Sequence, residues 1–154
     1  DWNFKIIGTP RLGINKLDPF SRKIKHDFES LGKRAEMLGF VNSEDLRHIM
    51  SETSIIVIPS KWNEPFGLVA AEAMSNGIAI VSSNSGGLPE IISNNGILID
   101  QINSKKISKN LKQILSNTSM LKELQKKSWE NFNFNSKKIS SILDDHRKEL
   151  FFKN

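Results

Sequence analysis

The chain has 154 residues and a mass of 17.4 kDa, which fits one domain of ordinary size. Hydrophobic residues make up 38% and charged residues 25%, which argues against a wholly disordered chain. The 22 Lys and Arg exceed the 17 Asp and Glu to give +5, a charge that permits anionic partners without selecting one. The lack of cysteine excludes disulfides, thiolate metal sites and a cysteine nucleophile. No apolar run approaches the roughly 18 residues of a membrane-spanning helix.

The first fifty residues predict short strands and helices in alternation. Residues 3–8 are expected to form a short strand, followed by a loop over residues 10–21 that contains proline and glycine. The spacing of apolar residues predicts a helix over residues 21–31, which ends at Gly32. A second strand is expected over residues 35–41. Ser43 is then predicted to cap the next helix, whose first turn is acidic.

Two continuous apolar runs, residues 55–58 and 78–81, predict strands that are buried on both faces. Further elements are helices at 67–75 and 88–93, a Gly- and Ser-rich loop at 82–87 and a strand at 96–99. Buried strands that alternate with helices are typical of a parallel sheet. The predicted fold class is therefore α/β, a Rossmann-like parallel sheet with helices on both faces.

Residues 101–154 predict a helical tail with helices near 104–116, 119–132 and 136–150. Its lysines are interpreted as solvated helix faces, and nucleic acid is not an expected partner because no aromatic residues interleave them. Ile139, Ile142 and Leu143 are expected to pack against protein. Peripheral contact of these basic helices with an anionic membrane stays open.

The clearest chemical pattern lies in residues 59–74, PSKWNEPFGLVAAEAM, where a strand stops and a helix starts near Gly67. In an open α/β sheet, ligands bind at the carboxyl ends of strands, and free N–H groups at a helix start favour anions. Glu64 precedes this helix and Glu72 lies two turns into it, and each carboxylate suits a pair of vicinal hydroxyls. The pattern fits a nucleotide sugar, but a plain loop glutamate and a salt-bridged helix glutamate fit the spacing as well.

The run from Glu64 to Gly77, EPFGLVAAEAMSNG, resembles the Glu-x7-Glu signature of glycosyltransferase family 4. Members of this family are retaining enzymes of the GT-B fold, in which two Rossmann-like domains face each other across a cleft. The resemblance extends over nearly the whole chain, through residues 4–8, 38–41, 78–82, 85–90, 95–99 and 132–136.

The resemblance implies roles for individual residues. Glu64 would be the catalytic residue and would contact hydroxyls of the donor sugar, while Glu72 would bind the ribose hydroxyls. Main-chain N–H groups near Phe66, Gly67 and Leu68 would meet the donor sugar and its diphosphate. The donor would be a UDP- or GDP-linked sugar, with no metal ion and no cofactor required.

The resemblance leads to three further expectations. Val41 lies where the main chain of the family often contacts the nucleotide base. Gly86 and Gly87 are expected to shape the neighbouring loop, with a plain tight turn as the alternative. Three histidines match no catalytic position of the family and are expected at the surface or at an interface: His26, His48 and His146.

Parts of the family pattern are not matched, namely the first strand, a Gly-Arg turn with a nearby lysine, and the N-terminal acceptor domain. We therefore expect residues 1–154 to be a partial C-terminal donor-binding domain, inactive alone, whose partner is the missing N-terminal domain. The first strand is central in this sheet, so the strands near residues 4–7 and 55–58 would lose their shared neighbour. They are expected to re-pair across the gap or to take a strand from a second copy in a dimer.

The expected function is that of a fragment of a retaining glycosyltransferase, which transfers the sugar to a glycan, lipid or small molecule. A cytoplasmic location is expected, with peripheral contact at the inner face of the plasma membrane left open. Three alternatives stay open: a non-catalytic nucleotide-sugar-binding module, an interaction module with a decayed pocket, and a relative of starch or sucrose synthases.

Overall fold

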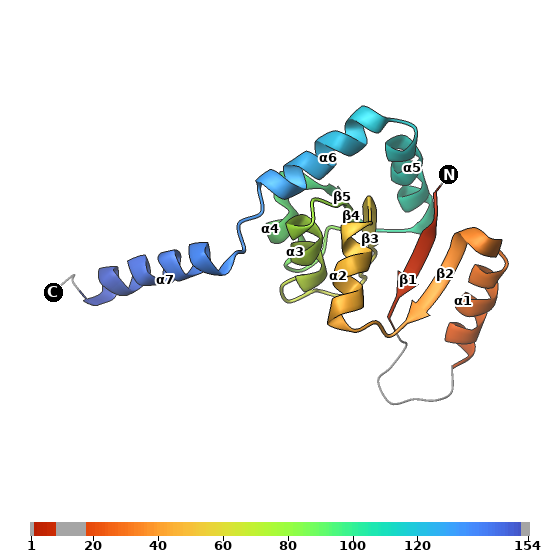
Figure 1. The fold of residues 1–154 in the computed structure, drawn as a ribbon, viewed down its shortest axis with the longest axis horizontal. Helices are drawn as coiled ribbons and strands as arrows, with labels where there is room; N and C mark the ends of the chain where they lie inside the picture. The colour runs from red at the N-terminus through yellow and green to blue at the C-terminus, as the bar shows by residue number, and fades with distance from the viewer. Residues whose placement is uncertain (1, 9–17, 152–154) are drawn as a thin grey trace. The chain divides into compact units, whose positions relative to one another are not determined.

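A computed structural model describes residues 2–8 and 18–151 and divides the chain into two compact units, residues 1–49 and 50–154 (Figure 1). The first unit contains β1 (Phe4–Ile7), α1 (Pro19–Glu29), a 3-10 turn (Gly32–Arg34) and β2 (Ala35–Gly39). The strands β1 and β2 pair in parallel, with Phe4 opposite Ala35. Helix α2 (Ser43–Ser51) spans the boundary between the units.

Helix α1 begins earlier than its apolar spacing predicts, because Asp18 caps it. The Asp18 carboxylate accepts hydrogen bonds from the N–H groups of Phe20 at 2.9 Å and Ser21 at 3.0 Å. Bonds from the Ser21 hydroxyl and its N–H lower the pKa of Asp18 below its ordinary value. The loop expected over residues 10–21 is therefore wrong at its end, and its part at residues 10–17 lies outside the described residues. Phe28 of this helix is buried, with its ring centre 5.1 Å from that of Phe4.

The predicted cap of α2 is wrong by one residue. The Asn42 side-chain oxygen accepts hydrogen bonds from the N–H groups of Glu44 and Asp45, both at 3.0 Å. Asn42 is therefore the cap, and Ser43 is the first helical residue. Strand β2 ends at Gly39 instead of Val41, since Gly39 turns the chain with a φ of 66°.

The second unit is built on a parallel sheet in the order β3–β4–β5, with β4 in the centre. Its elements, in chain order, are β3 (Ile55–Ile58), α3 (Leu68–Ser75), β4 (Ala79–Ser83), α4 (Leu88–Ile92), a 3-10 turn (Ser93–Asn95), β5 (Ile97–Ile99), α5 (Ser104–Leu115), α6 (Thr118–Glu130) and α7 (Ser136–Phe151). The predicted parallel arrangement of strands and helices is confirmed.

Helices cover both faces of this sheet (Figure 1). On one face, Ala79 and Val81 of β4 form a core with Ile114 of α5 and Leu124 of α6. On the other face, which Ile80 occupies, α3 and α4 pack against β4. Strand β4 is buried throughout, so the predicted burial is confirmed, but the strand covers Ala79–Ser83 instead of residues 78–81 and extends into the predicted loop. Strand β3 is only half-buried before Ile58, contrary to the prediction, because it pairs on one side only, with β4.

The described residues form two separate parallel sheets, β1–β2 and β3–β4–β5. The predicted re-pairing across the gap would join a strand of one unit to a strand of the other, so it stays a prediction. The predicted exchange of a strand with a second copy stays a prediction.

The helices of the tail differ in how much of their surface is buried. Helices α5 and α6 bury Ile114 and Leu124 against the sheet, whereas the described side chains of α7 are exposed. The packing of the exposed apolar residues of α7 against protein, expected at Ile139, Ile142 and Leu143, therefore stays a prediction. None of the helices in the described ranges is both long and apolar enough to span a membrane.

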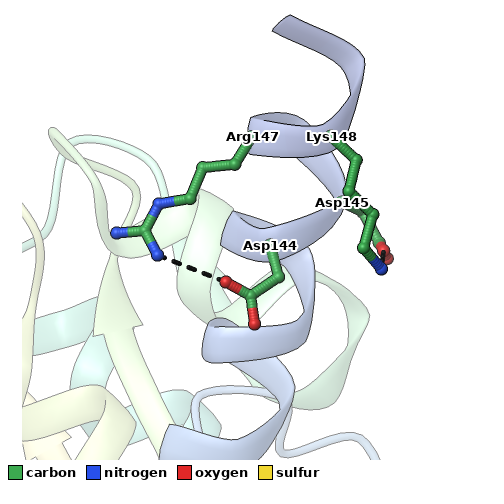
Figure 2. A network of polar contacts seen from close by, with 4 residues as sticks. All are labelled: Asp144, Asp145, Arg147 and Lys148. Atoms are coloured by element: carbon green, nitrogen blue, oxygen red, sulfur yellow. Dashed lines mark hydrogen bonds and ion pairs between the residues drawn. The ribbon is translucent and has the colours of Figure 1, made fainter. Parts of the chain in front are cut away.

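Ion pairs one turn apart support the exposed helix α7. The Oδ1 atom of Asp144 lies 3.2 Å from Nη1 of Arg147, and the Oδ1 atom of Asp145 lies 3.4 Å from Nζ of Lys148 (Figure 2). Such pairs at i and i+3 stabilise a helix by about 0.2–0.5 kcal/mol each. They fit the interpretation of the tail charges as a solvated face.

Candidate functional site

The candidate site is built from two loops at the carboxyl ends of neighbouring parallel strands. One loop connects β3 to α3 and the other connects β4 to α4. Because adjacent parallel strands end at the same edge of a sheet, both loops lie where α/β sheets bind their ligands. The predicted residues Glu64, Phe66 and Gly67 belong to the first loop, and Leu68 opens the helix that follows.

Gly67 forms the turn into α3, and its backbone conformation favours glycine. Its φ of 100° and ψ of 51° lie in the left-handed region. A Cβ at this position would also lie 2.9 Å from Cδ2 of Leu88 in α4. No side chain caps the helix, and the Gly67 carbonyl accepts bonds from Ala70 and Ala71. The first N–H groups of α3 have no carbonyl partner within the helix, which leaves them free for an acceptor.

The Glu64 carboxylate is held by two neighbours in its own loop. Its Oε1 atom accepts a hydrogen bond from the Ser60 hydroxyl at 2.7 Å and one from the Trp62 indole N–H at 3.0 Å. Glu64 and Ser60 are half-buried, while Trp62 is exposed. Sequence reasoning identified Glu64 but missed Ser60 and Trp62, although both lie within four residues of it.

The β4–α4 loop packs tightly on the main chain of the Glu64 loop. The Gly87 N–H donates to the Glu64 carbonyl at 2.7 Å, and the Ser85 hydroxyl donates to the Trp62 carbonyl at 2.9 Å. A Cβ on Gly86 would lie 2.3 Å from the Glu64 carbonyl oxygen, and one on Gly87 would lie 2.9 Å from that of Phe66. The two glycines therefore shape the neighbouring loop, as expected, and are more than a plain tight turn.

Glu72 occupies the exposed face of α3. It lies one turn after Leu68, so the two side chains share a face of the helix, and both are exposed. The opposite face is buried and carries Ala70, Ala73 and Met74. The Glu72 carboxylate therefore lies beyond the helix start, on its solvent side.

Phe66 has a contact that sequence reasoning missed. Its ring meets that of Phe134 edge-on, with centres 5.6 Å apart, and Phe134 lies 6.2 Å from Phe132. The segment between α6 and α7 therefore reaches the candidate site. The signal in the sequence was the pair of phenylalanines that alternate with asparagines over residues 131–135.

The structure brings together five of the predicted residues within the second unit: Glu64, Phe66, Gly67, Leu68 and Glu72. Val41 follows β2 in the first unit, so its contact with a base stays a prediction. His26, His48 and His146 are exposed, as expected. Within residues 2–8 and 18–151, no three His, Asp or Glu side chains are arranged to hold a metal ion.

A family model named glycosyl transferases group 1 matches residues 1–131. The chain belongs to this family. Among the curated relatives, an uncharacterized glycosyltransferase of Methanocaldococcus jannaschii is 28% identical over 155 residues, which cover 94% of this chain and 42% of the relative. The chain thus spans less than half the length of this relative.

Solved structures show the same fold. HepE of Anabaena, solved in complex with UDP, has a TM-score of 0.76 and 21% identity over 94% of this chain and 41% of its own. Sucrose-phosphate synthase of Thermosynechococcus elongatus has a TM-score of 0.76 and 26% identity over 97% of this chain and 39% of its own. The predicted fold class of this group 1 chain, that of a GT-B C-terminal half, is confirmed.

Proposed function

We propose that this chain is the donor-binding part of a retaining family 4 glycosyltransferase, which takes a nucleotide-diphosphate sugar at the loops after β3 and β4. The observation that supports this most is the Glu64 carboxylate, which Ser60 and Trp62 hold within the loop that leads into the uncapped start of α3. HepE has been solved with UDP and with UDP-glucose, which makes a UDP-linked donor the first choice and a GDP-linked donor the second.

In this proposal, the donor diphosphate lies at the start of α3. Gly67 presents no side chain there, and the N–H groups near Phe66 and Leu68 together with the helix dipole stabilise the negative charge. Neither a metal ion nor a cofactor is needed for this step. Glu72, one turn further along the helix, binds the ribose hydroxyls, and Val41 contacts the base.

The reaction in the complete enzyme breaks the bond between the sugar and the diphosphate. The start of α3 stabilises the charge that develops on the leaving diphosphate. Glu64 orients the sugar, and the acceptor hydroxyl attacks from the face that the diphosphate leaves, so the anomeric configuration is retained. The acceptor is a glycan, a lipid or a small molecule.

The other partners belong to the same proposal. An N-terminal acceptor domain of the same protein supplies the second half of the site, and residues 1–154 alone are inactive. The protein acts in the cytoplasm, and a nucleic acid is not among its partners. A dimer formed by strand exchange and peripheral contact with the inner membrane face both stay predictions.

A panel of UDP, GDP, ADP and their common sugars, titrated by calorimetry against the full-length natural protein, tests the proposal. We expect one base to be selected, and Glu72→Ala to weaken its binding about 10- to 100-fold, because hydrogen bonds to a charged group contribute about 1.5–3 kcal/mol. Glu130→Ala, an exposed glutamate in α6, is the matched control and should bind as the natural protein does. Equal binding by the Glu72 variant would contradict the assigned role, and no binding across the panel would contradict the proposed function.

A further inference from the structure

Both protein donors that reach the Glu64 carboxylate bind the same oxygen. The Ser60 hydroxyl and the Trp62 indole N–H donate to Oε1, at 2.7 Å and 3.0 Å. Each oxygen of a carboxylate accepts about two hydrogen bonds, so these two donors saturate Oε1. Across residues 2–8 and 18–151, no protein donor bonds to Oε2. The carboxylate is thus divided into an oxygen that the protein holds and an oxygen that is open to a ligand.

The backbone of the Glu64 loop has hydrogen bonds of its own, apart from the two side-chain bonds. The main chain is already tied to the β4–α4 loop by the bond from Gly87 N–H to the Glu64 carbonyl and the bond from Ser85 to the Trp62 carbonyl. What Ser60 and Trp62 add is the orientation of one side chain, which would otherwise sample several rotamers. Such preorganisation of a ligand-binding group is the usual reason for a second layer of hydrogen bonds.

We propose that Ser60 and Trp62 are positioning residues of the donor site, which hold Glu64 so that Oε2 accepts a hydroxyl of the donor sugar. This inference rests on the proposed function, since it assumes that Glu64 meets the sugar. It assigns the two residues to recognition of the sugar and not of the nucleotide, because Glu64 precedes the start of α3 and the nucleotide lies along that helix.

The test compares UDP-glucose with UDP on the full-length natural protein, or the GDP pair if the panel selects guanine. Ser60→Ala and Trp62→Phe each remove one donor. Each should weaken binding of the nucleotide sugar about five- to tenfold and leave the affinity for the nucleoside diphosphate within about twofold. Ser60→Thr keeps the hydroxyl and should bind the nucleotide sugar about as tightly as the natural protein does. Ser116→Ala and Trp129→Phe are the matched controls, because they change the same residue types directly after α5 and within α6. Neither should alter the affinity for the nucleotide sugar or for the nucleoside diphosphate.

A double-mutant cycle shows whether the two residues act through Glu64. In a Glu64→Ala background, removing Ser60 or Trp62 should cost no further affinity for the nucleotide sugar, because the group that they position is gone. An equal loss for UDP and UDP-glucose, or an additive loss in the Glu64→Ala background, would overturn the inference and leave the proposed function standing. Sugar binding that is unaffected by Glu64→Ala would likewise overturn the inference alone, because the natural protein would still bind the donor. No binding of either ligand by the natural protein would overturn both the inference and the proposed function.

Discussion

Replacement of Glu64 by alanine is expected to lower turnover of the full-length enzyme about 10²- to 10³-fold, the usual cost of removing one group that stabilises a transition state. The affinity for the nucleoside diphosphate should change far less, because in the proposed arrangement Glu64 contacts the sugar and not the nucleotide. Turnover is measured as release of the nucleoside diphosphate from the donor sugar, and affinity by calorimetry.

The control for Glu64→Ala is Glu130→Ala, an exposed glutamate at the end of α6 that should leave both quantities unchanged. Comparable losses of turnover and nucleotide affinity in the Glu64 variant would contradict its role in orienting the sugar. The same assay separates the enzyme from the non-catalytic module, because a module of that kind would bind the donor without releasing its nucleotide.

Replacement of Gly86 by alanine is expected to destabilise the second unit by roughly 2–5 kcal/mol. A left-handed conformation costs a residue with a Cβ about 1–2 kcal/mol, and overpacking adds about 1–3 kcal/mol. Gly86 has a φ of 57°, and its Cβ would lie 2.3 Å from the Glu64 carbonyl oxygen and 2.4 Å from the Glu64 nitrogen. Both contacts are with backbone, which cannot move aside without displacing Glu64. Urea unfolding measures the loss.

Gly77→Ala separates the two causes. Gly77 has a φ of 65°, close to that of Gly86, but a Cβ there would make only ordinary contacts, the nearest at 3.5 Å from Cβ of Trp129. The Gly77→Ala variant should therefore lose only the cost of a left-handed backbone conformation, about 1–2 kcal/mol of the free energy of unfolding. Equal losses in the two variants would show that the β4–α4 loop does not press on the Glu64 loop.

The parts of the fold that follow from local pattern could be predicted from the sequence. The apolar run at residues 78–81 is buried and supplies the first three residues of β4, and α3 starts directly after Gly67. The half-exposure of β3 could not be predicted, because an apolar run does not say whether the strand has neighbours on both sides. The cap of α2 was misplaced because Asn42 and Ser43 are both good caps and stand side by side.

In the candidate site, too, the local sequence pattern predicts some features, while others depend on side-chain conformation or on distant segments. The motif identified Glu64 and Glu72 because their spacing is a property of the chain. It did not identify the hydrogen bonds from Ser60 and Trp62, since these depend on rotamers within an irregular loop. The contact of Phe66 with Phe134 joins segments far apart in the sequence, and periodicity carries no information on such pairs.

The central claim is that the donor binds at the β3–α3 loop, and hydrogen exchange of the full-length protein with and without a saturating nucleotide sugar tests it most directly. Amides that gain a ligand bond or lose access to water exchange more slowly. We predict slower exchange in peptides that cover residues 59–72, with unchanged exchange in α6 as the internal reference. Unchanged exchange over residues 59–72 while the donor is bound would contradict the claim.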